Sequence, residues 1–575
     1  MRRLAIAITF LGTLLQAQSI IEGGTWTYSR AGGMQTLAAA DVPDGTPTML
    51  RVVTTVATPS TPWDSQMSRV LPPAIASGRW FRFRLWARSE TRSRIGLIHE
   101  LNSSPFSKSL SSMIALTPEW KEYAIAYQTA AYAASGSALR IQAGFTVGTI
   151  ELANIRLEDF GPQAEPPQSI NLDIFGGQEV NSDWREAAQA RIREHRMSDL
   201  QIAVVDAEDK PIPGAKVQVE QLSHAFRFGT AVADGPLFAN TADGERYRLE
   251  LKRLFNYVVT ENALKWGFNN GSGYPVADRM LRWFEDNGLP ARGHVLVWPN
   301  YEHLPTSVRN LRGEDLRRAV EFHVRDYVDK TRGRVVAWDV VNEAFTNTEV
   351  LRDGGRDLLW KSFQWAREVN PDIDLVYNDY NISNVRAGAN DTHRNAVLAI
   401  IRELLDNGAP VTALGDQAHM GVPLTPIPRV LEAWDELSQF GLPIEITEFD
   451  VTFGGPRDEE AQARYLDDYL TAAFSHPNIR SFLMWGFWDG AHWLANQGAG
   501  LFRRDWTSRP MLDTYERLVF RDWWTRAEGV TDDDGAYQIR AFRGKHRVTI
   551  SIEGQEPKSY DLDLTAEPGL LRIQM

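Results

Sequence analysis

Two glutamates stand in sequence contexts that suit paired acid and base chemistry. Glu343 ends the run VVAWDVVNE and Glu448 lies in the run PIEITEFD, and both runs have the apolar character of buried strands. Hydrolysis of a glycosidic bond needs two such carboxyl groups: one protonates the leaving oxygen, and the other attacks the sugar or activates water. The acid needs a raised pKa, and a neighbouring negative charge contributes to that rise. The pair therefore predicts a glycosidase site.

Other polar and aromatic side chains follow further apolar runs of the same kind. In a parallel barrel, the carboxyl ends of all strands meet at one rim, so these side chains would converge there. His419 and Asp450 fit a supporting role, because an imidazole held between two carboxylates orients the nucleophile. The remaining strand-end candidates, in chain order, are Glu261, Asn262, His294, Trp298, Asn342, Tyr380, Gln417, Trp485 and Trp493.

A metal-dependent hydrolase is an alternative interpretation of the same residues. Histidine, aspartate and glutamate are ligands for zinc and magnesium. However, the sequence has no HxH or HExxH spacing, and its strand-end carboxylates are not clustered on adjacent strands. We therefore predict neither a metal nor another cofactor, and the alternative would show itself as loss of activity with a chelator.

The elements that must position these residues alternate strictly between apolar strand and amphipathic helix from about residue 226. Eight such units over about 300 residues predict a closed (β/α)8 TIM barrel spanning 226–525. An open doubly wound sheet would need a glycine-rich phosphate loop after its first strand, and FRFGTAVADGP is not one. The predicted strands lie at 226–232, 257–262, 292–298, 335–343, 374–379, 411–420, 443–450 and 481–489.

The segments outside the barrel have β character. Residues 22–160 alternate apolar and polar positions between turn-forming clusters, with period two at 81–87, 123–130 and 139–145, which predicts a β-sandwich of the jelly-roll kind. The Pro-rich stretch GPQAEPPQS begins a predicted linker at 161–199. Each of the segments 200–222 and 529–575 contains a strand, a turn and a strand, so we expect them to pair into one accessory β-unit.

The composition limits the class of protein. The net charge of −13 disfavours nucleic acid as a partner and is compatible with a neutral polymer, and the lack of cysteine excludes disulfides and thiolate sites. Residues 1–18 read as a signal peptide, with Arg2 and Arg3 before an apolar run that is too short for a stable membrane span. We therefore expect a monomer without a membrane span that is secreted or periplasmic.

The motifs resemble glycoside hydrolase family 10, whose members are mainly endo-β-1,4-xylanases that retain configuration. The resemblance covers roughly 226–522. WDVVNEAF implies that Glu343 is the acid/base residue and that Asn342 contacts a sugar 2-hydroxyl. ITEFD implies that Glu448 is the nucleophile, with Asp450 behind His419.

The same resemblance implies the sugar-binding residues and a polysaccharide partner, a β-linked xylan. VTENALKWGF implies that Glu261, Asn262 and Lys265 bind sugar on the non-reducing side of the cleavage point. The N-terminal sandwich is similar to a carbohydrate-binding module, and its strand pattern assigns no ligand. The other residues implied for substrate binding are His294, Trp298, Tyr380, Gln417, Trp485 and Trp493.

Two positions depart from the family pattern. Pro299 stands where the family usually has a second histidine, and Phe449 where leucine is commoner. Proline cannot donate a hydrogen bond, so either a neighbour such as Asn300, Tyr301 or His303 replaces the donor, or the pocket is widened for a decorated sugar. We expect the second outcome, because proline stiffens the loop and redirects YEHLP.

Alternative functions remain for the same barrel. One is hydrolysis of another β-linked backbone, such as a mixed β-glucan. Another is a non-catalytic glycan-binding protein, although a binder has no reason to hold both Glu343 and Glu448. Internal or chain-end cleavage depends on loop lengths around the cleft.

Overall fold

The computed structural model describes residues 18–19, 21, 25–30, 32–59, 61–90, 94–162, 182–384, 391–421, 424–452 and 459–575. The described residues before Ile174 form one compact unit, and those within Phe175–Thr452 and Glu459–Met575 form a second. Except for Gln18, the predicted signal peptide lies outside the described residues. Among the described residues, no helix combines the length and apolar character needed to cross a membrane.

The N-terminal unit is built from two antiparallel sheets, as predicted for a β-sandwich. One sheet has the order β3-β4-β11-β6-β9 with β1 beside β11, and the other has the order β2-β5-β10-β7-β8. The strands are β1 Gln18–Ser19, β2 Thr27–Arg30, β3 Gly32–Ala38, β4 Thr48–Thr54, β5 Ser65–Leu71, β6 Trp80–Arg88, β7 Arg94–Leu101, β8 Lys108–Ala115, β9 Lys121–Gln128, β10 Ser137–Gln142 and β11 Gly148–Gly161.

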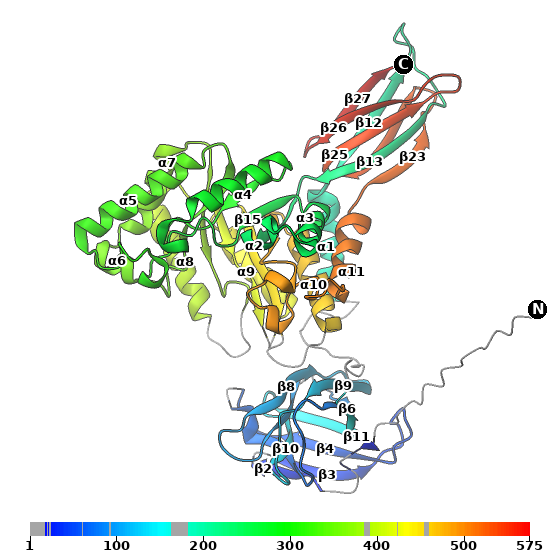
Figure 1. The fold of residues 1–575 in the computed structure, drawn as a ribbon. Coiled ribbons are helices and arrows are strands. Elements are labelled where there is room, and N and C mark those ends of the chain that lie inside the picture. The colour runs from blue at the N-terminus through cyan, green and yellow to red at the C-terminus, as the bar shows by residue number, and fades with distance from the viewer. Residues whose placement is uncertain are drawn as a thin grey trace, which may run out of the picture. The chain divides into compact units, whose positions relative to one another are not determined.

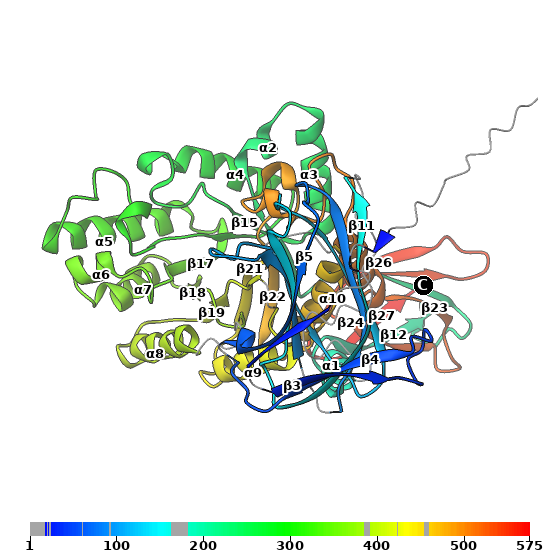
Figure 2. The ribbon, with the colours of Figure 1, turned by 90° about the horizontal axis from the view of Figure 1, so that it is seen from below.

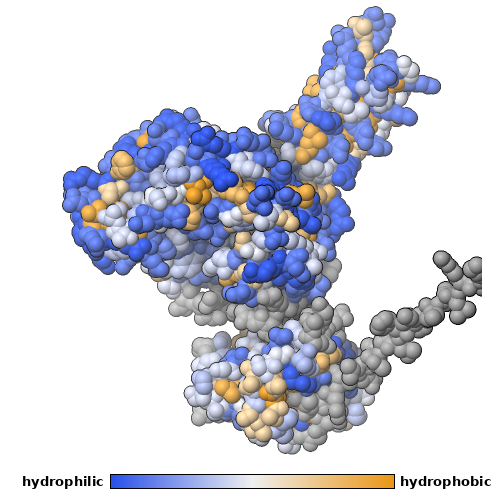
Figure 3. All heavy atoms as spheres, in the orientation of Figure 1, coloured by the Kyte–Doolittle hydropathy of each residue, from blue (hydrophilic) through white to orange (hydrophobic). Residues whose placement is uncertain are grey.

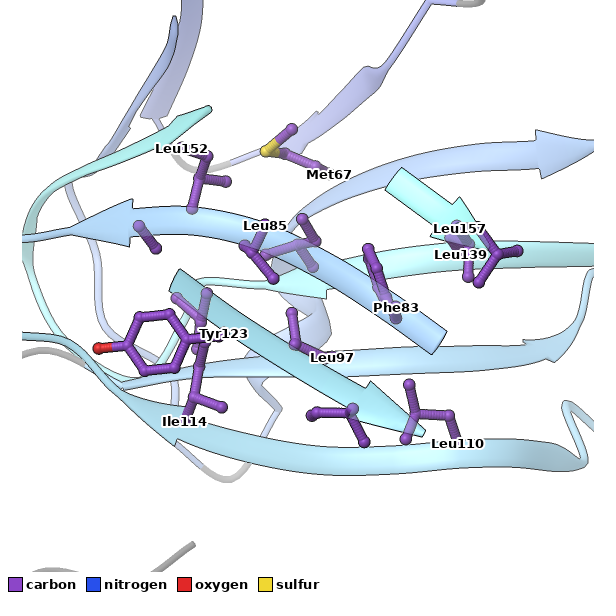
Figure 4. Close-up of a cluster of buried hydrophobic side chains, with 14 of the residues drawn as sticks. Met67, Phe83, Leu85, Leu97, Leu110, Ile114, Tyr123, Leu139, Leu152 and Leu157 are labelled. Atoms are coloured by element: carbon purple, nitrogen blue, oxygen red, sulfur yellow. The ribbon is translucent and has the colours of Figure 1, made fainter. Parts of the chain in front are cut away.

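Strict alternation along the strands produces the core of this unit (Figure 4). Phe83 and Leu85 of β6 are fully buried and lie in one cluster with Leu97 of β7. The intervening Arg82 and Arg84 are directed to the other face of the sheet, where Arg82 Nε lies 2.6 Å from a carboxylate oxygen of Glu158. A side-chain period of two therefore separates an apolar layer from a charged one.

The second unit contains the predicted barrel. Eight parallel strands pair in chain order and close through β14 with β22, while β19 pairs with β21. The prediction of a (β/α)8 barrel is confirmed. The strands are β14 Arg227–Val232, β15 Tyr257–Thr260, β16 Ala291–Gly293, β17 Val335–Asn342, β18 Asp374–Asp379, β19 Ala413–Asp416, β21 Ile444–Thr452 and β22 Ile479–Met484, and the short β20 His419–Gly421 pairs with β21.

Amphipathic helices surround the strands. In α5, Leu316, Val320 and Val324 recur every four residues and are fully buried. Figure 2 shows α5, α7 and α8 on the same side of strands β17 to β19, and Figure 3 shows a largely hydrophilic surface over them. The helices are α2 Asp234–Phe238, α3 Ala242–Leu254, α4 Tyr274–Asp286, α5 Gly313–Lys330, α6 Glu349–Gly354, α7 Leu358–Val369, α8 Thr392–Asp406, α9 Ile427–Ser438, α10 Glu459–Ser475 and α11 Pro510–Arg517.

The segments that flank the barrel in sequence come together in a small β-sandwich (Figure 1). One sheet has the order β24-β12-β27 and the other has the order β23-β13-β25-β26. Leu200 and Ile202 of β12 pack with Val217 of β13 in a shared apolar core. The strands are β12 Met197–Val205, β13 Lys216–His224, β23 Arg526–Val530, β24 Ala536–Phe542, β25 Gly544–Ser551, β26 Lys558–Leu564 and β27 Gly569–Gln574.

Part of the predicted linker 161–199 is structured instead. Helix α1, Asp183–His195, occupies it, while residues 163–181 lie outside the described part of the chain. Arg185 on α1 forms two hydrogen bonds of 2.6 and 2.7 Å with the carboxylate of Asp468 on α10. Helix α1 is therefore packed on the barrel.

Candidate active site

Glu343 follows β17 directly and is held by three hydrogen-bond donors. Its Oε2 accepts hydrogen bonds from Trp298 Nε1 and from Asn347 Nδ2, both at 3.1 Å, and its Oε1 accepts from Gln417 Nε2 at 2.9 Å. Its φ of 56° is in the left-handed region, which residues other than glycine seldom adopt. Such local strain is concentrated at functional sites.

Glu448 lies on β21 and is almost fully buried. Its Oε1 accepts a 2.8 Å hydrogen bond from Asn378 Nδ2, and its Oε2 lies 3.3 Å from His419 Nε2. His419 Nδ1 lies 2.9 Å from Asp450 Oδ2, which also accepts a 2.9 Å hydrogen bond from Trp493 Nε1. The predicted placement of an imidazole between two carboxylates is therefore observed.

A chain of amides links the two glutamates. Asn342 Oδ1 accepts hydrogen bonds from Gln417 Nε2 at 3.2 Å and from Asn378 Nδ2 at 2.9 Å. The same two amides hold Glu343 and Glu448, so both carboxyl groups are fixed to one scaffold. Asn342 Nδ2 is buried and has no hydrogen-bond partner among the described residues, which leaves a donor beside both carboxyl groups.

The surroundings separate the ionisation of the two carboxyl groups. Burial raises the pKa of Glu343, and the charge of Glu448 adds to the rise. Burial also opposes the charged form of Glu448, but the hydrogen bond from His419 and the charges of His294, His419 and Lys265 outweigh it and lower its pKa to about 2. Burial lowers the pKa of His419, but the two neighbouring carboxylates dominate and raise it to about 10. The surroundings thus shift the pKa values of the two carboxyl groups in opposite directions.

The polar residues that follow β15 lie beside Trp298. Lys265 Nζ donates a 2.9 Å hydrogen bond to Asn262 Oδ1 and lies 5.5 Å from the ring centroid of Trp298 and 5.8 Å from that of Trp485. Burial raises the pKa of Glu261, although the charge of Lys265 opposes this rise. Burial lowers the pKa of Lys265, although Glu448, Glu261 and Glu343 oppose this change. The predicted sugar-binding residues after β15 therefore share one electrostatic neighbourhood with both glutamates.

His294 is positioned by buried charges at the barrel interior. Its Nδ1 lies 2.9 Å from Asp339 Oδ2, and Arg292 contacts both Asp339 and Glu445. The His294 ring lies edge-on to Trp485, with 5.0 Å between centroids. This buried ion network fixes the His294 ring beside Trp485.

Tyr380 lies at the edge of the site without a hydrogen bond to either glutamate. Its hydroxyl donates to Thr346 Oγ1 at 3.2 Å, and its ring lies 4.3 Å from that of His393. Burial raises the pKa of Tyr380, and the charge of Glu343 contributes to the rise. Among the described residues, no group of three or more His, Cys, Asp or Glu side chains is arranged to hold a metal ion.

The segment after Pro299 places His303 against Trp298, and the expected widening of the pocket stays a prediction. The His303 ring stacks on the Trp298 ring, with 3.6 Å between centroids and 22° between planes. Pro299 O accepts a hydrogen bond from Val350 N, and Tyr301 N donates to Glu349 Oε2, so α6 fixes the path of the segment. His303 thus covers one face of the Trp298 ring.

Four residues of this site were missing from the predicted set. Asn378 ends a predicted strand, but its bridge to Glu448 depends on neighbouring strands. Asn347 lies in a loop four residues beyond Glu343, and Asn300 Nδ2 donates to its Oδ1 at 2.8 Å. Asn300 and His303 were considered only as replacement donors. Only the strand-end position of Asn378 offered a sequence signal.

Comparisons with known proteins identify the family of this chain. A family model described as glycosyl hydrolase family 10 matches residues 219–517, about half of the chain. Anti-sigma-I factor RsgI6 of Acetivibrio thermocellus is 33% identical over 395 residues, covering 68% of this chain and 49% of that protein. Endo-1,4-beta-xylanase 1 of Arabidopsis thaliana is 27% identical, covering 62% of this chain and 36% of that protein.

The match to another relative covers almost the whole length of that protein. Endo-1,4-beta-xylanase B of Thermotoga neapolitana is 30% identical over 325 residues, covering 53% of this chain and 92% of that protein. The crystal structure of xylanase 10B from Thermotoga petrophila in complex with xylobiose is 28% identical with a TM-score of 0.47, covering 52% of this chain and 95% of that one. The extent of the family match and the near-complete coverage of the Thermotoga neapolitana relative show that this chain belongs to glycosyl hydrolase family 10.

Proposed function

We propose that this chain is an endo-1,4-β-xylanase that acts with retention of configuration, with Glu343 as acid/base and Glu448 as nucleophile. The observation that carries the assignment is one amide scaffold that holds both carboxyl groups, in surroundings that shift their pKa values in opposite directions. Titratable pairs whose surroundings push their pKa values apart identify the acid and the base.

In the first step, Glu448 attacks the anomeric carbon while Glu343 gives its proton to the leaving oxygen. A glycosyl ester forms on Glu448 as the glycosidic bond breaks. The hydrogen bonds from Trp298, Gln417 and Asn347 then stabilise the new Glu343 carboxylate. In the second step, this carboxylate takes a proton from water, the water oxygen attacks the anomeric carbon, and Glu448 leaves as an anion.

His419 keeps the nucleophile charged and oriented. With its pKa raised, the imidazolium donates toward Glu448 from one nitrogen and toward Asp450 from the other. The family resemblance implies that Asn342 contacts the sugar 2-hydroxyl, and its Nδ2, which has no partner among the described residues, can donate this hydrogen bond. Hydrogen bonds to this hydroxyl strengthen in the transition state of glycoside hydrolysis.

Xylan as the substrate is supported by the names of the similar proteins. The matched proteins of Arabidopsis thaliana and Thermotoga neapolitana are endo-1,4-beta-xylanases, and the similar crystal structure holds xylobiose. A neutral polysaccharide also suits a chain with a net charge of −13. The proposal extends to secretion or export to the periplasm through residues 1–18 and to carbohydrate binding by the N-terminal unit.

Hydrolysis of xylan tests the proposal. The wild type should release xylo-oligosaccharides from xylan and be much slower on mixed β-glucan. Glu448→Gln should abolish release, while the matched surface variant Glu432→Gln on α9 should retain it. Absence of xylan hydrolysis by the wild type, or full activity of Glu448→Gln, would contradict the proposal.

A further inference from the structure

A cavity of about 320 Å³ lies beside Trp298. Two loops form its walls: the one after β15, which carries Asn262 and Lys265, and the one after β16, which carries Glu302 and His303. This volume is at the lower end of the range for ligand pockets, about 300–1,000 Å³. The cavity therefore suits a small part of a substrate, such as one sugar unit of a chain.

The two loops are packed directly on each other. A Cβ atom at Gly267 would lie 2.4 Å from the backbone oxygen of His303, so only glycine permits this approach. Asn270 Oδ1 accepts a 2.6 Å hydrogen bond from Thr306 N. These two contacts fix the backbone at His303 and at Thr306 relative to the loop that carries Lys265.

The short 3₁₀ helix Tyr301–His303 is also fixed from within. Asn300 caps it, because its Oδ1 accepts from Glu302 N at 2.6 Å and from His303 N at 3.3 Å. The Tyr301 hydroxyl donates a 2.8 Å hydrogen bond to Asp353 Oδ2. His303 is therefore held in place before any ligand arrives, which lowers the entropy cost of binding.

The His303 side chain has unused hydrogen-bonding capacity. Its ring is half-buried and stacks on Trp298, yet neither ring nitrogen is hydrogen-bonded to another of the described residues. Burial lowers the pKa of His303, and the charge of Lys265 contributes in the same direction. A neutral imidazole offers one donor and one acceptor, which matches the two roles of a sugar hydroxyl.

We propose that His303 binds a hydroxyl of the sugar unit distal to the cleaved bond on the non-reducing side. The proposal rests on the proposed xylanase function. Trp298 lies between Glu343 and His303: its Nε1 donates a hydrogen bond to Glu343, and its ring face packs on His303. His303 thus lies one side chain further from the acid/base group than Trp298, next to Lys265 and Asn262 in the same cavity.

The test compares aryl β-xyloside with aryl β-xylobioside, which adds the distal sugar. His303→Phe keeps a ring against Trp298 but removes both nitrogens. It should lower kcat/KM for the xylobioside roughly 2- to 13-fold more than for the xyloside, the effect of one lost hydrogen bond. His303→Gln should recover part of this difference, and His195→Phe on α1 should not change the ratio.

The possible outcomes separate the two proposals. If His303→Phe lowers kcat/KM equally for both substrates, the proposed role of His303 is wrong. Xylan hydrolysis by the wild type would still support the proposed function in that case. A wild type that cleaves neither these substrates nor xylan would overturn the proposed function, and the role of His303 with it.

Discussion

Glu343 and Glu448 carry the same side chain, and only their surroundings distinguish them. Glu448 lies next to a histidine whose pKa is raised to about 10, whereas Glu343 accepts hydrogen bonds from the neutral groups of Trp298, Asn347 and Gln417. Charge-assisted hydrogen bonds are about twice as strong as neutral ones, so the stronger stabilisation of the anion is at Glu448. The proposed roles of acid/base residue and nucleophile follow from this difference.

One prediction concerns the pKa of Glu343, the proposed acid/base residue. The hydrogen bond from Trp298 lowers the pKa of Glu343 against the effect of burial. Trp298→Phe keeps most of the ring but removes the donor, so the pKa of Glu343 should rise. The alkaline limb of kcat/KM against pH, which reports the essential acid of the free enzyme, should move to higher pH.

The control for this profile is Trp283→Phe, which changes a half-buried tryptophan on α4. It should leave the alkaline limb in place. A limb that moves to lower pH in Trp298→Phe, or does not move, would mean that Trp298 does not stabilise the charged form of Glu343.

His419 gives a prediction on stability. Its folded-state pKa is raised from 6.5 to about 10, so its stabilising contribution is fully present below pH 6.5 and is lost as pH rises through about 10. The difference in Tm between wild type and His419→Asn, measured by calorimetry, should therefore be largest near pH 6 and shrink toward pH 10. With His195→Asn as control, a difference that is constant or grows over this range would refute the raised pKa.

At the scale of elements, apolar periodicity was enough to predict the barrel strands but not every packed segment. Strand ends are set by local sequence, so Glu343 and Glu448 could be placed at one rim. Helix α1 was missed because it follows a Pro-rich stretch, although Trp184, Ala188 and Ile192 recur every four residues and are buried. Asn347 and His303 lie in loops, where packing against neighbouring loops, and no periodic pattern, decides their positions.

The contact between α1 and α10 leads to a stability prediction. The Asp468 side chain is only 5% exposed, so Arg185→Ala would leave a nearly buried carboxylate without these two hydrogen bonds. Because Arg185 is itself 28% exposed, the expected loss of unfolding free energy is moderate, about 1–3 kcal/mol.

The matched control is Arg572→Ala, since the pair of Arg572 with Asp209 is exposed on both sides. Exposed pairs contribute about 0–1 kcal/mol, so this variant should be nearly neutral in urea unfolding. Equal effects of the two substitutions would mean that α1 contributes no more than a surface contact.

At the scale of the whole molecule, the boundary between the two units can be tested by truncation. A chain of residues 182–575 keeps α1, the barrel and the accessory β-sandwich, and should retain wild-type kcat/KM on soluble xylo-oligosaccharides. A chain of residues 197–575 lacks α1 and should have a lower Tm. If both truncated chains have the same Tm, α1 is not an integral part of the second unit.

The central claim is that Glu448 forms a covalent intermediate while Glu343 serves as acid and then base. Proton NMR of xylan hydrolysis tests it most directly, because two displacements at the anomeric carbon retain its configuration. Recorded before mutarotation equilibrates the products, the first new reducing ends should be the β-anomer. Initial appearance of the α-anomer would show a single displacement by water and would contradict Glu448 as the nucleophile.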